Sequence, residues 1–154
     1  MAAACTSTKD LGGLGPPGIG LLQKSFSQSG SYVDCFTFSV GGPASSGGFV
    51  GELDIWGNRL NINVSSISLY SGNTQLQIDT SPLLFSFGGL LNGAVYTLQV
   101  ASQVSGTWGL YDSNVGYAGK IVTLASAAPE PAAYALAIVG LAVVGASVLR
   151  ARRR

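Results

Sequence analysis

Histidine is absent from this chain of 154 residues, and charged residues make up only 10% of it. Without histidine, neither a Ser-His-Asp triad nor a Cys-His pair can form. A zinc site is disfavoured too, because histidine and cysteine are its usual ligands and the chain has only two cysteines. A two-carboxylate glycosidase needs no histidine, but no pair of acids stands out as catalytic. We therefore expect a protein that is not an enzyme and needs no cofactor or metal.

A basic surface is lacking as well. Residues 1–128 carry four basic and six acidic side chains, a net charge of −2. The remaining positive charge lies at the chain end, in Arg150, Arg152, Arg153 and Arg154. Because nucleic acids are bound by clustered Lys and Arg, we expect no nucleic-acid partner. Low charge together with 22 glycines is typical of exported β-proteins.

Most of the chain predicts short β-strands. Residues 32–40 alternate between an apolar face and a face of small or polar side chains. Residues 67–69 are expected to pair with residues 76–78 across a turn at 71–74, so that Ile67 and Leu69 meet Leu76 and Ile78. Further strands are expected at 21–26, 49–55, 60–64, 94–102 and 120–124, and 83–87 is either a strand or a turn. This pattern favours one antiparallel, jelly-roll-like β-sandwich over residues 9–124.

The C-terminal segment has a different composition. Residues 132–149 form an apolar run without a charge. As a helix this run would reach about 27 Å, enough for the hydrocarbon core of a bilayer, and its Leu, Ile and Val residues favour insertion by about 2.4–4.8 kcal/mol. The arginines that follow resist translocation, which predicts a cytoplasmic C-terminus and a body outside. A buried core helix is the alternative, but globular helices of this length seldom lack a polar face.

The tail also resembles a known signal. Pro129-Glu130-Pro131, the apolar run and the arginine cluster occur in the order of the PEP-CTERM sorting signal of Gram-negative bacteria. The resemblance implies that exosortase, a membrane-embedded cysteine protease or transpeptidase, recognises residues 129–154 and removes the tail near the tripeptide. It also implies passage through the inner membrane to the cell surface or extracellular matrix, alongside exopolysaccharide. Residues 125–128 are interpreted as a linker.

A second resemblance lies in the body. Tyr32, Asp34 and Phe36, within Tyr32-Val33-Asp34-Cys35-Phe36, resemble the motif that names the FxDxF-type PEP-CTERM proteins, with Tyr32 in place of the first Phe. Residues 90–100 and the glycines before residue 120 fit the same pattern. This family has no established biochemical activity, so the resemblance implies architecture and location only.

Three acids are candidates for chemistry. Strand alternation places Asp34 on the apolar face, where a charge must be paired or hydrogen-bonded. It is either a calcium or sugar ligand or, as we favour, an acceptor of backbone N–H groups from a neighbouring loop. Glu52 and Asp54 share a face, and the apolar residues beside them predict that both acids lie on the solvated side of a sheet.

Loop residues supply further candidates. Asp112-Ser113-Asn114 offers side-chain oxygens but lacks the ligand series of an EF-hand, and turn chemistry explains it. Exposed aromatics in or beside loops can stack on sugars, although packing in the core or at its rim is favoured because Trp is highly buried on average. These aromatics are Trp56, Trp108, Tyr111 and Tyr117.

The two cysteines allow one disulfide in an exported chain. A Cys5–Cys35 bridge would close a loop of about 30 residues and contribute about 3–4 kcal/mol. However, Cys5 follows three alanines that resemble the end of a signal peptide or a lipoprotein cleavage box, and a lipidated Cys5 would leave Cys35 alone. Residues 1–14 have neither the basic start nor the apolar stretch of an export signal. We therefore interpret residues 1–8 as a remnant or processing region and expect the true start upstream.

The sequence thus predicts a small exported β-sandwich that is held in the inner membrane by residues 132–149 and cut by exosortase. It would reach the surface or matrix as a structural or adhesive component. Two alternatives stay open, namely a carbohydrate-binding module that uses Trp56 or Trp108 and a protein that remains anchored by its tail.

Overall fold

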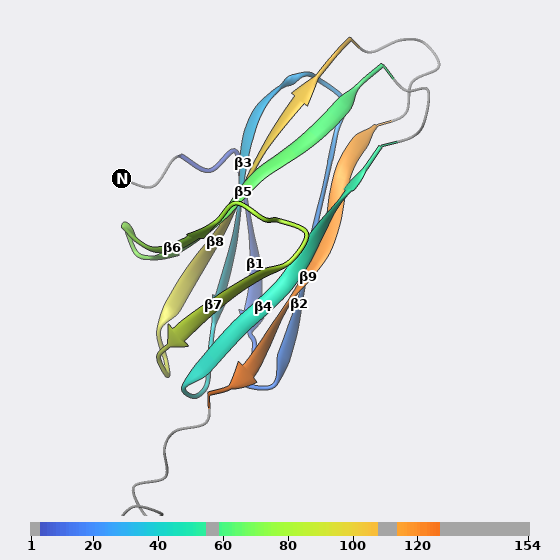
Figure 1. The fold of residues 1–154 in the computed structure, drawn as a ribbon. Coiled ribbons are helices and arrows are strands. Elements are labelled where there is room, and N and C mark those ends of the chain that lie inside the picture. The colour runs from blue at the N-terminus through green and yellow to red at the C-terminus, as the bar shows by residue number, and fades with distance from the viewer. Residues whose placement is uncertain (1–3, 55–58, 108–113, 127–154) are drawn as a thin grey trace, which may run out of the picture.

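A computed structural model of the chain contains two packed β-sheets (Figure 1). It describes residues 4–54, 59–107 and 114–126, and no helix occurs among them. The strands are β1 (Ser7–Gly13), β2 (Gly18–Phe26), β3 (Gly30–Ser39), β4 (Ala44–Leu53), β5 (Asn61–Ser71), β6 (Thr74–Asp79), β7 (Phe85–Leu90), β8 (Val95–Ser105) and β9 (Val115–Ala125). The predicted all-β sandwich is confirmed.

The strand order identifies the type of sandwich. One sheet has the order β1-β3-β8-β5-β6, and the other has the order β2-β9-β4-β7. Antiparallel pairs nest from the outside of the sequence inwards, as β2 with β9, β3 with β8, β4 with β7 and β5 with β6. Nested pairing of eight strands in two sheets is the topology of a jelly roll. The remaining strand, β1, adds to the edge of β3 in the parallel direction.

The core lies between the two sheets and follows the alternation of the sequence. Phe36 and Phe38 on β3 are buried, as are Leu98 and Val100 on the neighbouring β8. The opposite sheet contributes Tyr117 and further residues of β2, β4, β7 and β9. The inward positions predicted for 32–40 and 94–102 are confirmed, because a two-residue period is a strong signal when one face is buried.

The β5–β6 hairpin forms where expected, but its predicted side-chain pairing is wrong. A two-residue turn pairs Ser71 with Thr74, and a register irregularity between Leu69 and Tyr70 then places Leu69 opposite Gln77. One extra residue in a strand turns every later side chain to the other face. Leu76 and Ile78 are therefore 46% and 55% exposed, whereas Ile67 and Leu69 are buried.

Several boundaries also differ from the sequence predictions. β5 is one continuous strand from Asn61 to Ser71, and residues 85–90 form the strand β7. β1 was not predicted, and it begins inside the segment 1–8 that was interpreted as a processing region. β4 starts at Ala44 because Ala44 and Ser46–Gly48 pair with both neighbouring strands, although such small residues carry no apolar alternation.

Among residues 4–54, 59–107 and 114–126, no helix is long and apolar enough to cross a membrane. The predicted membrane helix 132–149, the tripeptide 129–131 and the arginine cluster lie outside the described residues.

Candidate functional site

Asp34 lies between the sheets and is only 1% exposed. The Ser7 hydroxyl donates a hydrogen bond to Asp34 Oδ1 at 2.6 Å, and the Tyr117 hydroxyl donates one to Asp34 Oδ2 at 2.8 Å. Ser7 belongs to the added strand β1, and Tyr117 belongs to β9 of the opposite sheet. Asp34 is hydrogen-bonded as expected, but its predicted donors were wrong, because they are hydroxyls and not backbone N–H groups of a loop.

The Tyr117 phenol is a fixed donor to this carboxylate. Burial raises the pKa of Tyr117 far above its ordinary value, and the negative charge and hydrogen bond of Asp34 raise this pKa further. The phenol therefore stays protonated at any physiological pH and cannot act as a base. Tyr117 was grouped with the aromatics in or beside loops; it lies within β9 and is fully buried, so the favoured role of packing in the core is confirmed for it.

The other two motif residues also serve the fold. Phe36 is buried in the core, and the Tyr32 ring packs against Phe26 with 4.3 Å between the ring centroids. The Tyr32 hydroxyl donates to the backbone oxygen of Gln28 at 2.9 Å. Residues 32, 34 and 36 thus lie along the inner face of β3, where a solvent-borne ligand has no access to Asp34.

A disulfide joins Cys5 to Cys35, one residue beyond Asp34, with 5.7 Å between the two Cα atoms. Next to it, Thr6 N donates to the Val33 carbonyl oxygen at 2.6 Å, and Val33 N donates to Thr6 Oγ1 at 3.0 Å. The bridge closes a sequence separation of 30 residues, which corresponds to about 3–4 kcal/mol in the chain-entropy account. The disulfide and these hydrogen bonds therefore hold the start of β1 against β3, next to Asp34.

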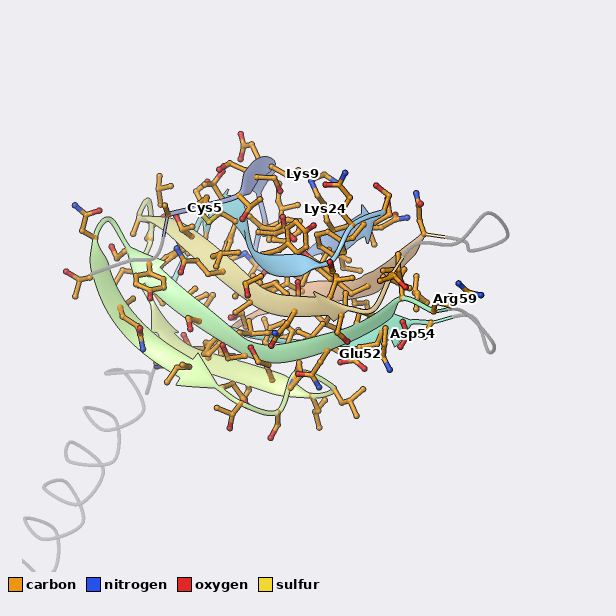
Figure 2. The ribbon with its side chains drawn as sticks, turned by 90° about the horizontal axis from the view of Figure 1, so that it is seen from above. Cys5, Lys9, Lys24, Glu52, Asp54 and Arg59 are labelled. Carbon is orange, nitrogen blue, oxygen red and sulfur yellow. A yellow bond between two sulfur atoms is a disulfide. The ribbon has the colours of Figure 1, made fainter. Side chains whose placement is uncertain are left out.

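Glu52 and Asp54 lie at one end of the sandwich (Figure 2), and both are exposed, as predicted. Glu52 Oε1 accepts a hydrogen bond from Val64 N at 2.6 Å, and Asp54 Oδ1 accepts one from Ile62 N at 3.3 Å. Leu53 between them is also exposed, at 52%, so this apolar residue does not mark a buried face. Both N–H groups lie beyond the part of β5 that pairs with β6, and a carboxylate that covers a free strand edge blocks further strand pairing.

The same side of the sandwich is tied again between its edge strands β6 and β7. The Gln77 side-chain amide of β6 donates to the Gly88 carbonyl oxygen, and its oxygen accepts from Gly88 N, both at 3.3 Å. Gly88 belongs to the edge strand β7 of the other sheet. Side chains thus occupy free backbone groups at two places on this side of the sandwich, which was not predicted because the partners lie on different strands.

The remaining candidates do not form a site. Within the described part of the chain, no group of three or more His, Cys, Asp or Glu residues could hold a metal ion. Trp56, Trp108, Tyr111, Asp112 and Ser113 lie outside the described residues.

A groove on the outer face of the four-stranded sheet was missed by the sequence analysis. It has a volume of about 530 Å³ and is lined by Gly47, Gly48, Phe49, Leu84, Phe85, Ser86, Lys120, Val122 and Leu124. The Phe49 ring is 42% exposed, and the Lys120 Nζ atom lies 5.8 Å from its centroid. An adjoining hollow of about 380 Å³ adds Ser45 and Ser46. This surface combines apolar contact, hydroxyl groups and one cation.

Comparisons with known proteins add little. No protein-family model and no curated protein matches the chain. Among solved structures, the chain is similar to Aeromonas hydrophila PliG, a periplasmic lysozyme inhibitor of g-type lysozyme. The TM-score is 0.43 at 10% sequence identity, with 75% of this chain and 99% of that chain covered. The likeness is distant, and nothing about this chain is inferred from it.

Replacing Tyr117 by Phe tests the buried link. Tyr117→Phe removes one of the two donors to Asp34, and a buried acceptor that loses a partner costs about 1–3 kcal/mol. We expect the free energy of unfolding in urea at pH 7 to fall by that amount. The matched control is Tyr32→Phe, because the Tyr32 hydroxyl bond is exposed and should be worth less than about 0.5 kcal/mol. Equal stabilities for the two variants would contradict the role of Tyr117.

The stabilities of the same two variants should also differ in how they depend on pH above 10. Above the ordinary tyrosine pKa of 10.0, the unfolded chain releases the Tyr117 proton while the folded chain keeps it. The unfolded state then binds fewer protons, so this residue lowers the stability by up to about 1.4 kcal/mol per pH unit. The stability of Tyr117→Phe should fall less steeply between pH 10 and 11 than that of Tyr32→Phe.

Proposed function

We propose that this chain is an exported, non-enzymatic β-sandwich that exosortase sorts to the cell surface or extracellular matrix, in association with exopolysaccharide. The disulfide is the observation that carries the proposal of export. Disulfides form and persist in oxidising compartments and are rare in the cytosol. The Cys5–Cys35 disulfide joins the segment before β1 to β3. Formation of this disulfide is therefore part of the correct folding of the body.

The place where the body ends supports the proposal of sorting. β9 ends at Ala125, and Ser126 N donates to the Pro43 carbonyl oxygen at 3.1 Å. The tripeptide Pro129-Glu130-Pro131 follows three residues later. The nine strands thus precede the tail in sequence, so exosortase would need to unfold none of them in order to remove the tail.

The chemistry of the body supports a role without catalysis. Asp34 is enclosed and bound to two hydroxyls. Glu52 and Asp54 each accept a backbone N–H group. These three acids are thus engaged in holding strands together, which suits a structural or adhesive component.

Analysis of the mature C-terminus tests the sorting. The full chain, placed behind an export signal, is produced in a Gram-negative host with an exosortase and in the same host without it. We expect a released product that lacks the arginine cluster in the first host, and an intact chain in the inner membrane of the second. Mass spectrometry of the C-terminal peptide distinguishes them. An intact C-terminus in both hosts would contradict sorting and would favour the permanently anchored protein.

A carbohydrate-binding role is the second candidate, and the groove is the observation that favours it. Aromatic rings stack on the apolar faces of sugars, and Phe49 is the exposed aromatic of the groove lining. Lys120 beside it supplies a cation for an acidic sugar. The Ser45 and Ser86 residues that line the hollow offer hydroxyl groups to sugar hydroxyls. The best ligand would be an acidic polysaccharide.

Binding of polygalacturonate, with neutral dextran for comparison, tests this role by titration calorimetry. Lys120→Gln should weaken polygalacturonate binding at least about tenfold, because a hydrogen bond to a charged group contributes about 1.5–3 kcal/mol. Phe49→Ala should weaken it as well, through loss of stacking. Lys9→Gln removes the same charge from β1 on the other sheet and should leave binding unchanged. Equal losses in Lys9→Gln and Lys120→Gln would show that the groove is not the binding surface.

A further inference from the structure

The end of the sandwich from which the tail departs has an unusual composition. Three connections meet there, namely 14–17 between β1 and β2, 40–43 between β3 and β4, and 91–94 between β7 and β8. In Figure 1 this is the lower end of the sandwich, where the arrowhead of β9 lies. We call it the exit end and define it as residues 11–21, 39–46, 88–95 and 121–126. No residue in these four segments is charged.

Large apolar side chains are exposed at the exit end. They come from both sheets and from the connection before β8, and each is between 57% and 66% exposed. They are Ile19, Leu21, Leu91, Val95 and Leu124. Single exposed apolar residues are normal, whereas several gathered at one end without a charge mark an interaction surface.

The backbone of the exit end is hydrogen-bonded within itself. Gly41 N donates to the Gly15 carbonyl oxygen at 2.6 Å, and Gly93 N donates to the Val40 carbonyl oxygen at 2.9 Å. Leu91 N donates to the Tyr96 hydroxyl at 2.7 Å, and the Thr123 hydroxyl donates to the Leu14 carbonyl oxygen. The three connections therefore form one linked platform. Pairing of this kind is what a lipid environment requires, because water is not there to satisfy backbone groups.

The length of chain after Ser126 limits where the platform can lie. Six peptide steps separate Ser126 from Ala132, where the apolar run begins, and such a stretch spans at most about 22 Å. Ser126 is itself bound to Pro43 on the platform. A strand of 11 residues such as β9 is about 36 Å long. If residues 132–149 enter a bilayer, the exit end is the end of the body that faces it.

We propose that the exit end docks on the lipid surface while the tail is in the membrane. This inference rests on the proposed function, because it takes residues 132–149 as the membrane span. The nearest charges are Asp10, which lies three strand residues from the connection 14–17, and Lys120, which lies opposite Leu21 at the inner limit of the exit end. Three strand residues span about 10 Å. That uncharged depth matches the burial of interfacial segments, about 5–10 Å into the boundary between headgroups and acyl chains.

The absence of charge also specifies the lipid. Anionic lipids are recognised by clustered Lys and Arg, which the exit end lacks. Docking should therefore occur on zwitterionic phosphatidylcholine and should not respond to salt. It would hold the sorting tripeptide at the membrane surface, where a membrane-embedded enzyme acts.

Quenching by lipid-borne bromine tests the docking. The full chain is reconstituted into phosphatidylcholine vesicles with bromine on the acyl chains, as the variants Leu91→Trp and Leu53→Trp. Both positions are exposed leucines, at 66% and 52%, and Leu53 lies at the far end of β4, so it is the matched control. The unsubstituted chain gives the background of the native tryptophans. We expect the brominated lipid to quench the fluorescence of the tryptophan introduced by Leu91→Trp and to leave that of Leu53→Trp unchanged. High salt or added phosphatidylglycerol should not alter this quenching.

Extraction at alkaline pH, measured on the same vesicles, separates the two claims. Retention of the chain without quenching of Leu91→Trp, or with equal quenching of both variants, would overturn docking and leave the membrane anchor intact. Release of the chain from the vesicles at alkaline pH would refute the membrane anchor. If Leu91→Trp is also not quenched, docking of the exit end is refuted as well. If Leu91→Trp is shielded only in concentration-dependent dimers, a second copy covers the exit end and docking on lipid is refuted.

Discussion

One buried carboxylate fixes how this molecule is put together. An ionised Asp34 between two sheets is tolerated only with partners, since an unpaired charge in such a place is very costly. Its partners come from two different places, Ser7 on β1 and Tyr117 on β9. β1 must therefore lie on the edge of β3, and β9 must cross above it with its tyrosine turned inward. The Cys5–Cys35 bridge makes the first of these links covalent.

Charged residues are distributed unevenly along the sandwich. Glu52, Asp54 and Arg59 gather at one end (Figure 2), where the two acids cover the free edge of β5. The exit end carries no charge. This asymmetry agrees with the proposed orientation, in which the charged end faces water and the exit end, from which the chain leaves β9, faces lipid. The groove has Phe49 and Lys120 outside the exit end but shares Val122 and Leu124 with it.

The sequence predicted the structure well where the two-residue alternation of apolar and polar side chains, or a short turn, determines it. Alternation in 32–40 and 94–102 predicted which side chains are buried, and the turn residues at 71–74 predicted the β5–β6 hairpin. The predictions were wrong where the structure depends on a single irregularity in a strand or on a partner that is distant in sequence. The extra residue near Leu69 reversed the facing of β6, and no local pattern signals a bulge of this kind.

The donors to Asp34 are 27 and 83 residues away in sequence, so only the need for partners could be inferred. β1 was missed because its side chains are mostly exposed and it pairs in parallel on an edge. The groove was missed because exposed and buried residues, such as Phe49 and Val50, follow one another in an apolar stretch. The tail was interpreted from composition and order alone, and its interpretation stays a prediction.

The central claim is that the tail holds an oxidised body outside the cytoplasm. A green fluorescent protein fused after Arg154 tests it, read together with the redox state of Cys5 and Cys35 in cells without exosortase. The account predicts fluorescence confined to the inner membrane, from a reporter folded in the cytoplasm, and cysteines that resist alkylation until they are reduced. Fluorescence spread through the soluble cytosol, from a chain with two free thiols, would contradict it.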